Sequence, residues 1–230
     1  KTDNLGGLLR FADAVGIKQD LRKFKDYLVR KLSSSAVRVL YNAEVTDDLI
    51  ESFRPDNILI ATGSCPVTPD FIKGYENARH ASTVYFDISS ERSKNIVIVG
   101  GGLVGVETGL YLTELSKNVT VLEATENIAG DSMGVYKLAL LGKLREAGVN
   151  VITSAKVTEI KAGEVTYEKD GSMQSLSCDT VLYAVGMRSV NDEYFRLYDK
   201  APFVSIIGDA KKVGKVDGAI HSGYFASMDI

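Results

Sequence analysis

The chain has 230 residues, and 27 Lys and Arg against 30 Asp and Glu give it a formal net charge of −3. Hydrophobic residues make up 45% and charged residues 25%, which is usual for a globular protein. The slightly acidic balance argues against a nucleic-acid or anionic-membrane surface. The sequence contains no run of 18 apolar residues, so it predicts no membrane-spanning helix.

The two cysteines, Cys65 and Cys178, are far apart in the chain and form no CxxC motif. This spacing disfavours a structural zinc site, a redox dithiol and a disulfide scaffold. Together with the lack of a recognisable signal peptide, it predicts a cytoplasmic protein, and we expect no metal site.

Short β-branched runs alternate with helical patterns along the chain, which predicts an α/β fold. In the first part, the spacing of apolar residues predicts a helix over 20–32 and strands over 37–41 and 58–60. Residues 64–94 contain prolines and are predicted to form a connector into a second unit.

From residue 95 on, buried strands alternate with longer helices. The predicted strands are 95–99, 118–123, 149–152, 180–183 and 203–207, and the predicted helices are 106–115, 133–147 and one from about 217 to the end. An antiparallel meander over 156–160, 164–168 and 173–177 is expected between them, with Asp170-Gly171 as its hairpin turn.

The most informative motif is Gly100-Gly101-Gly102-Leu103-Val104-Gly105, a GxGxxG sequence between an apolar strand and a helix. Gly100 permits the tight turn, Gly102 lets a pyrophosphate approach the backbone, and Gly105 lets helix and strand pack closely. The helix N-terminus, with Leu103 and Val104, offers N–H groups and a partial positive charge to phosphates.

Glu123, at the end of the next strand, completes this dinucleotide pattern. Its carboxylate can accept hydrogen bonds from the adenine-ribose hydroxyls and would repel a 2′-phosphate, and no arginine stands at Ala124 or Thr125. The pattern therefore predicts NAD(H) rather than NADP(H). The alternative is a glycine-rich turn in an α/β fold that binds nothing.

With these motifs, the sequence resembles the pyridine nucleotide–disulfide oxidoreductases, flavoproteins with two dinucleotide-binding domains. Ala61-Thr62-Gly63 resembles the motif at the crossing from the FAD domain to the NAD domain, and Ala184-Val185-Gly186 resembles its counterpart at the return crossing. Ile206-Ile207-Gly208-Asp209 resembles the late FAD motif, whose aspartate contacts the flavin ribityl and pyrophosphate region. In relatives, a glutamate at the position of Glu107 lies near the nicotinamide; the alternative here is a helix-surface carboxylate.

Within this group, three segments resemble the C-terminal flavin module of the NADH:flavin oxidoreductases of the 2,4-dienoyl-CoA reductase and 2-enoate reductase type. They are Leu5-Gly6-Gly7-Leu8-Leu9, Asp26-Tyr27-Leu28 and Asn42-Ala43-Glu44-Val45-Thr46. The resemblance implies a cofactor contact for Gly186 and FAD contacts for Gly6, Gly7, Val45, Ala61, Thr62, Gly63, Gly208 and Asp209.

The resemblance also implies the domain organisation. A Rossmann-like NAD(P)-binding domain with the β-meander, residues 94–187, is expected as an insertion in an incomplete FAD-binding domain of the same type. That FAD domain is formed by 1–93, connector included, and 188–230. The FAD domain's own first glycine turn is missing, so the chain is expected to be a fragment in which FAD binding is weak or absent.

The implied function is the NADH- and FAD-binding module of an oxidoreductase that passes a hydride from NADH to FAD and electrons on to a second centre. The expected partners are the nicotinamide dinucleotide, an upstream flavin barrel of the same full-length chain and, in a dimer, a second copy. No residue is assigned a catalytic role. The alternatives are a stand-alone NADH oxidase or ferredoxin-type reductase and, in another class, a nucleotide-sensing or docking module.

Overall fold

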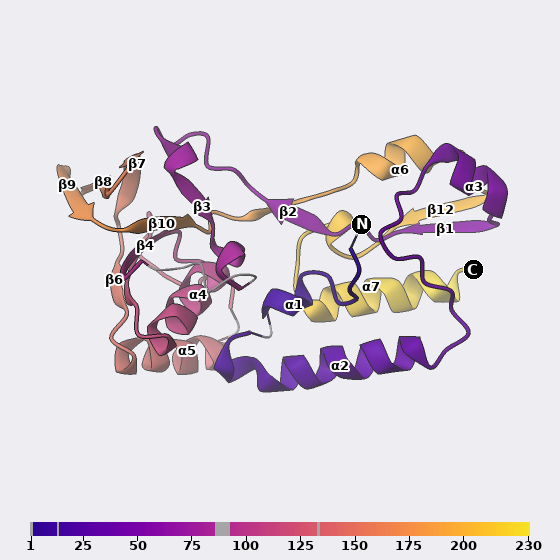
Figure 1. Ribbon diagram of the computed structural model, residues 1–230, viewed down its shortest axis with the longest axis horizontal. Helices are drawn as coiled ribbons and strands as arrows, with labels where there is room; N and C mark the ends of the chain where they lie inside the picture. The colour runs from indigo at the N-terminus through magenta and orange to yellow at the C-terminus, as the bar shows by residue number, and fades with distance from the viewer. Residues whose placement is uncertain (1, 13, 86–92, 133) are drawn as a thin grey trace. The chain divides into compact units, whose positions relative to one another are not determined.

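The computed structural model describes residues 2–12, 14–85, 93–132 and 134–230 (Figure 1). The chain forms two compact units. The first contains Lys1–Arg10, Asp20–Cys65 and Met187–Ile230, and the second contains Phe11–Gln19 and Pro66–Gly186. The predicted functional division at 93/94 and 187/188 stays a prediction.

The second unit is built on a five-stranded parallel sheet. Its strands are buried, β-branched runs, as expected where both faces of a parallel sheet are covered. In spatial order they are β3 (Ala78–His80), β10 (Thr180–Tyr183), β4 (Asn95–Val99), β5 (Asn118–Leu122) and β6 (Asn150–Ile152).

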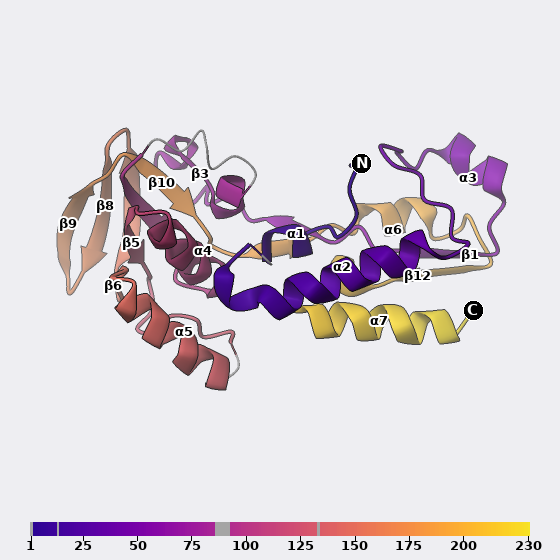
Figure 2. The same ribbon diagram turned by 60° about the horizontal axis from the view of Figure 1, so that its bottom comes forward.

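Alternate residues of β4 pack into two separate hydrophobic cores, one on each face of the sheet. Ile96 and Ile98 pack with α4 (Leu103–Glu114) and α5 (Gly134–Glu146) on one face of the sheet. Val97 and Val99 pack on the other face, with the core beneath the meander. Figure 2 shows the meander and α4 on opposite sides of this sheet.

The meander forms as the sequence predicts. Strands β7 (Lys156–Lys161), β8 (Glu164–Lys169) and β9 (Ser172–Ser177) pair antiparallel. Asp170 and Gly171 both have positive φ, 52° and 72°, which a tight two-residue hairpin turn requires.

An N-terminal segment also belongs to the second unit. It runs from the end of α1 (Leu9–Ala12) to the short 3₁₀ helix η1 (Gly16–Lys18), and Val15 between them is 1% exposed in the core with α4. This packing brings Lys18 to α4, which is 85 or more residues away in the sequence.

In the first unit, β1 (Asn57–Ile60) pairs in parallel with β12 (Phe203–Ile206). Strands β2 (Ser64–Pro66) and β11 (Met187–Ser189) pair where the chain passes between the units. The helices associated with this unit are α2 (Gln19–Ser33), α3 (Asp47–Phe53), α6 (Asp192–Leu197) and α7 (Val216–Met228).

Most predicted elements are confirmed within a few residues, but the strand predicted over 37–41 is wrong. That stretch forms no strand, and Val37, Leu40 and Tyr41 are exposed. A strand needs a hydrogen-bonding partner, and in this unit the described strands pair only with one another. The helix predicted from Met133 begins at Gly134 in the described residues, and Met133 itself lies outside them.

Several short elements went unpredicted, and one predicted helix begins earlier than expected. The helix predicted over 106–115 begins three residues earlier, at Leu103, because the end of the glycine motif is already helical. The connector contributes β3 to the edge of the sheet, and α3 and α6 are helices of seven and six residues. Elements this short carry too few residues for a clear periodicity.

Gly100 is a position where both the backbone angle and the space around it exclude a side chain. It has φ of 110°, and a Cβ there would lie 2.4 Å from the Ala184 carbonyl oxygen. We expect Gly100→Ala to lower the free energy of unfolding by about 2 kcal/mol or more. Gly142→Ala, in α5 with open space at the Cβ position, is the matched control and should gain up to about 1 kcal/mol in urea unfolding. Equal stabilities of the two variants would contradict this account.

His80 should make the stability of the protein sensitive to acid. Its side chain is buried, its Nδ1 accepts the Ser82 N–H, and burial lowers its pKa from 6.5 to about 4. Because the unfolded chain binds more protons between these values, stability is lost as pH falls from about 6.5 to about 4, by as much as roughly 3 kcal/mol. Urea unfolding of wild type and His80→Asn across this range should show a smaller pH dependence in the variant; parallel curves would contradict the prediction.

Candidate dinucleotide site

The glycine turn joins β4 to α4 at the carboxyl edge of the parallel sheet, where open α/β folds bind ligands. The Gly100 N–H donates to the Leu122 carbonyl at 2.8 Å, which ties the turn to the end of β5. A Cβ at Gly105 would lie 1.9 Å from the Gly100 carbonyl oxygen. Gly100 and Gly105 thus have the steric roles that the sequence predicts.

Gly102 is the N-cap of α4, with extended backbone angles of −64° and 178°. It is exposed, and no atom lies within 4 Å of the place where its Cβ would stand. The N-terminal end of α4, called the helix mouth below, is therefore open to solvent in front of Gly102. A phosphate group fits such a place, because the first N–H groups of a helix lack intrahelical partners.

Glu123 has a role in the turn that the sequence did not reveal. Its Oε2 accepts the buried Gly101 N–H at 2.6 Å, and its Oε1 accepts the N–H and hydroxyl of Thr125, both at 2.8 Å. A carboxylate offers about four lone-pair positions, so three bonds leave room for another donor. The side chain is partly exposed, and a ribose hydroxyl fits this remaining capacity.

The amide of Leu103, predicted to contact the cofactor, already has a partner. Its N–H donates to Oδ1 of Asp131 at 3.2 Å. Asp131 belongs to no sequence motif and lies 28 residues after Leu103, so only the fold could show this contact. Val104, the next residue, is 42% exposed.

Glu107 lies in the interior, so the alternative of a helix-surface carboxylate is wrong. The residue is 5% exposed, and its Oε2 pairs with Lys18 Nζ at 2.6 Å. The Tyr136 hydroxyl donates to its Oε1 at 2.7 Å. Burial, together with this bond to the carboxylate, raises the pKa of Tyr136 far above its ordinary value, so Tyr136 stays a donor.

The return motif ends at the same edge of the sheet. Ala184 is buried beside Gly100, and Gly186 has φ of 122° and accepts the Val67 N–H through its carbonyl at 3.0 Å. The left-handed φ explains the glycine at position 186, since few other residues adopt it.

The first unit brings together the other two predicted motifs. The Asp209 carboxylate accepts the Ser64 hydroxyl and the Gly214 N–H, both at 3.1 Å. The Thr62 hydroxyl donates to the Val190 carbonyl, and Gly63 has φ of 77°. Residues 61–63 and 208–209 therefore lie near each other, joined through Ser64.

The two N-terminal glycines and Val45 lie elsewhere in the first unit. Gly6 and Gly7 have φ of 103° and 49°, in the left-handed region. The Val45 carbonyl accepts Arg196 Nη2 at 2.6 Å, and Arg196 also pairs with Glu193 and Asp47. Arg196 is a further residue that the sequence could not single out, because it lies 151 residues from Val45.

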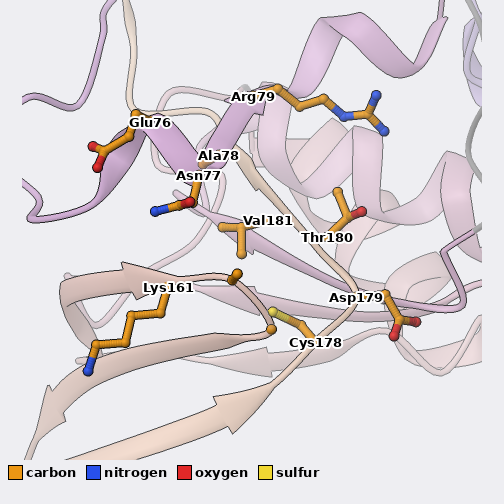
Figure 3. A pocket seen from close by; sticks show the side chains of 11 residues that line it. Glu76, Asn77, Ala78, Arg79, Lys161, Cys178, Asp179, Thr180 and Val181 are labelled. Carbon is orange, nitrogen blue, oxygen red and sulfur yellow. The ribbon is translucent and has the colours of Figure 1, made fainter.

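A separate cavity of about 380 Å³ lies at the opposite, amino edge of the sheet (Figure 3). The charged ends of Arg79, Lys161 and Asp179 point in different directions around it. Cys178 lines it, and burial raises the pKa of its thiol, which disfavours the reactive thiolate. This cavity presents no converging group of charges.

In the ranges that the structure describes, no three His, Cys, Asp or Glu side chains gather as a metal site. In the same ranges, no helix combines the length and apolar character that crossing a membrane requires.

A turn of this geometry beside an acidic strand end defines a dinucleotide-binding α/β protein. The family model described as pyridine nucleotide-disulphide oxidoreductase matches residues 12–203, and the chain belongs to this family. The predicted family and the α/β fold with its Rossmann-type domain are thereby confirmed, and the predicted cofactors NAD(H) and FAD agree with this family.

Two relatives and one solved structure are similar to this chain over nearly its whole length. An NADH oxidase of Thermoanaerobacter brockii is 33% identical over 100% of this chain and 36% of its own length. A metal reductase of Desulforamulus reducens is 32% identical over 97% of this chain and 38% of its own length. The structure of a 2-naphthoyl-CoA reductase complex matches with a TM-score of 0.91 and 27% identity, over 100% of this chain and 35% of that one. The chain thus spans little more than a third of these relatives, and the match supports the predicted enoate and dienoyl-CoA reductase-like branch.

The protein should need Lys18 for its stability, because Lys18 is the cation that pairs with the buried Glu107 carboxylate. Lys18→Met leaves a carboxylate that is 5% exposed without its cation, so we expect a loss of about 3 kcal/mol in the free energy of unfolding. The double variant Lys18→Met/Glu107→Leu removes both charges and should recover most of this loss in urea unfolding. An equal loss in both variants would mean that packing, rather than charge, holds the N-terminal segment.

Proposed function

We propose that this chain is the NADH- and FAD-binding module of a flavin-dependent oxidoreductase of the enoate and dienoyl-CoA reductase type. The observation that carries the proposal is the glycine turn at 100–105, whose helix mouth is open at Gly102 beside the acid Glu123. The names of two relatives, an NADH oxidase and a metal reductase, support it.

The nicotinamide dinucleotide would be held at the carboxyl edge of the sheet. Amides of Gly102, Leu103 and Val104 would face the pyrophosphate, and Glu123 the adenine ribose. Gly100 and Gly105 shape the turn. Glu107 and Gly186 are proposed neighbours of the nicotinamide end, with Glu107 held in place by Lys18 and Tyr136.

FAD would be held by the first unit in the full-length protein. Left-handed glycines and the Asp209 carboxylate, already fixed by Ser64, are suited to a phosphate- and ribityl-bearing ligand. The proposed residues are Gly6, Gly7, Val45, Ala61, Thr62, Gly63, Gly208 and Asp209. We expect this chain alone to bind FAD weakly or not at all.

With both groups bound, the chemistry that they would supply is hydride transfer from NADH to FAD, with the electrons passed on to a second centre. The residues of this chain contribute binding and orientation: the glycine turn holds the phosphates, Glu123 the sugar, and the buried Glu107 network fixes the second turn of α4. None of them is assigned the role of an acid or a base.

For the whole protein we propose an NAD domain over 94–187 within the FAD domain, an upstream flavin barrel and a dimer. We also propose a cytoplasmic location, because both Cys65 and Cys178 are free thiols.

Glu123 provides the test of cofactor choice. Glu123→Gln keeps an acceptor for the Gly101 N–H but removes the charge, and Ala124→Arg adds a phosphate-binding cation. Calorimetric titration should show wild type binding NADH more tightly than NADPH by about tenfold or more, and the double variant reversing that preference. The control Glu126→Gln, an exposed neighbouring acid, should leave the ratio unchanged. Absence of binding by wild type at millimolar NADH would contradict the proposed function.

A further inference from the structure

Asp131 places a carboxylate of the chain at the position where the dinucleotide phosphates are proposed to bind. Its Oδ1 accepts the N–H of Leu103, the first residue of α4. This N–H is one of the donors that a helix leaves without an intrahelical partner. α4 has 12 residues, so its N-terminus carries the partial positive charge that attracts an anion.

The loop that carries Asp131 is anchored on the glycine turn itself. The Ala129 N–H donates to the Gly101 carbonyl at 2.7 Å, and Ala129 is fully buried with φ of 49°. Both the N–H and the hydroxyl of Ser132 donate to the Ala129 carbonyl, at 3.1 and 2.7 Å. The loop is therefore tied to the glycine turn just before Asp131, and Ser132, just after it, is bonded back to Ala129 within the loop.

Two acids thus flank the mouth of α4, with different positions. Glu123 bonds to Gly101 and Thr125, on the side of the strand end, whereas Asp131 bonds to the first turn of the helix. A pyrophosphate needs the donors of that first turn and repels a carboxylate beside them. Glu123 is therefore placed to interact with the ribose of the dinucleotide, whereas Asp131 is placed beside its phosphates.

We propose that Asp131 is an internal competitor for the phosphate position and limits the affinity of the site for NAD(H). In the free protein it caps α4 through Leu103. On binding, the phosphates take over this N–H, and the carboxylate must turn away or stay beside a like charge. This inference rests on the proposed function, and it makes Asp131 an affinity-determining residue outside the glycine motif.

The test uses Asp131→Asn and Asp131→Ala, with Glu126→Gln as the exposed-acid control, titrated with NADH and with adenosine. Loss of the competing charge should tighten NADH binding about 3- to 10-fold, while adenosine, which has no phosphate, should bind equally to all variants. In the absence of nucleotide, Asp131→Ala removes the acceptor of the Leu103 N–H and should lower the melting temperature, whereas Asp131→Asn keeps an acceptor oxygen and should lower it less.

Unchanged or weaker NADH binding in the Asp131 variants would overturn the inference while leaving the proposed function intact. A purely structural role predicts this weaker binding, since the helix mouth would lose order. If neither wild type nor variants bound NADH, the proposed function itself would fail, and this inference with it.

Discussion

The close approach of Gly100 to the Ala184 carbonyl is the constraint on which the candidate site depends. A Cβ at position 100 would stand 2.4 Å from that oxygen, so β4 can turn into α4 beside β10 only without a side chain there. Gly105 repeats the constraint against the Gly100 carbonyl. Together these contacts bring the first turn of α4 to the edge of the sheet, and they leave Gly102 at an open helix mouth.

Two acidic side chains, Glu123 and Asp131, place negative charge around this turn, and Glu123 has two roles there. Glu123 satisfies the buried Gly101 N–H, which would otherwise be left without a partner, and keeps capacity for a ligand hydroxyl. One acid therefore serves both the fold and the proposed specificity. Asp131 adds a second negative charge at the helix mouth, where the helix dipole favours it.

The buried pair of Lys18 and Glu107 connects distant parts of the chain. Replacing a buried ion pair by apolar residues is often neutral or stabilising, so its presence is weak evidence for a stabilising role. Here both oxygens of the Glu107 carboxylate have a hydrogen-bond donor: Lys18 Nζ binds one oxygen, and the Tyr136 hydroxyl binds the other. The network holds the N-terminal segment against the second turn of α4, one turn beyond the proposed phosphate position.

The sequence by itself determined most of the parallel strands, the meander and the glycine turn, because each depends on local periodicity or on the steric freedom of glycine. It also predicted Glu123, since that residue follows a strand at a set spacing. Only the tertiary structure decided which partners the acids have, because Lys18 and Glu107 are 89 residues apart and Leu103 and Asp131 are 28 apart. It also decided against a strand over 37–41, because a strand depends on a neighbouring chain segment for its hydrogen bonds, and no local pattern contains that information.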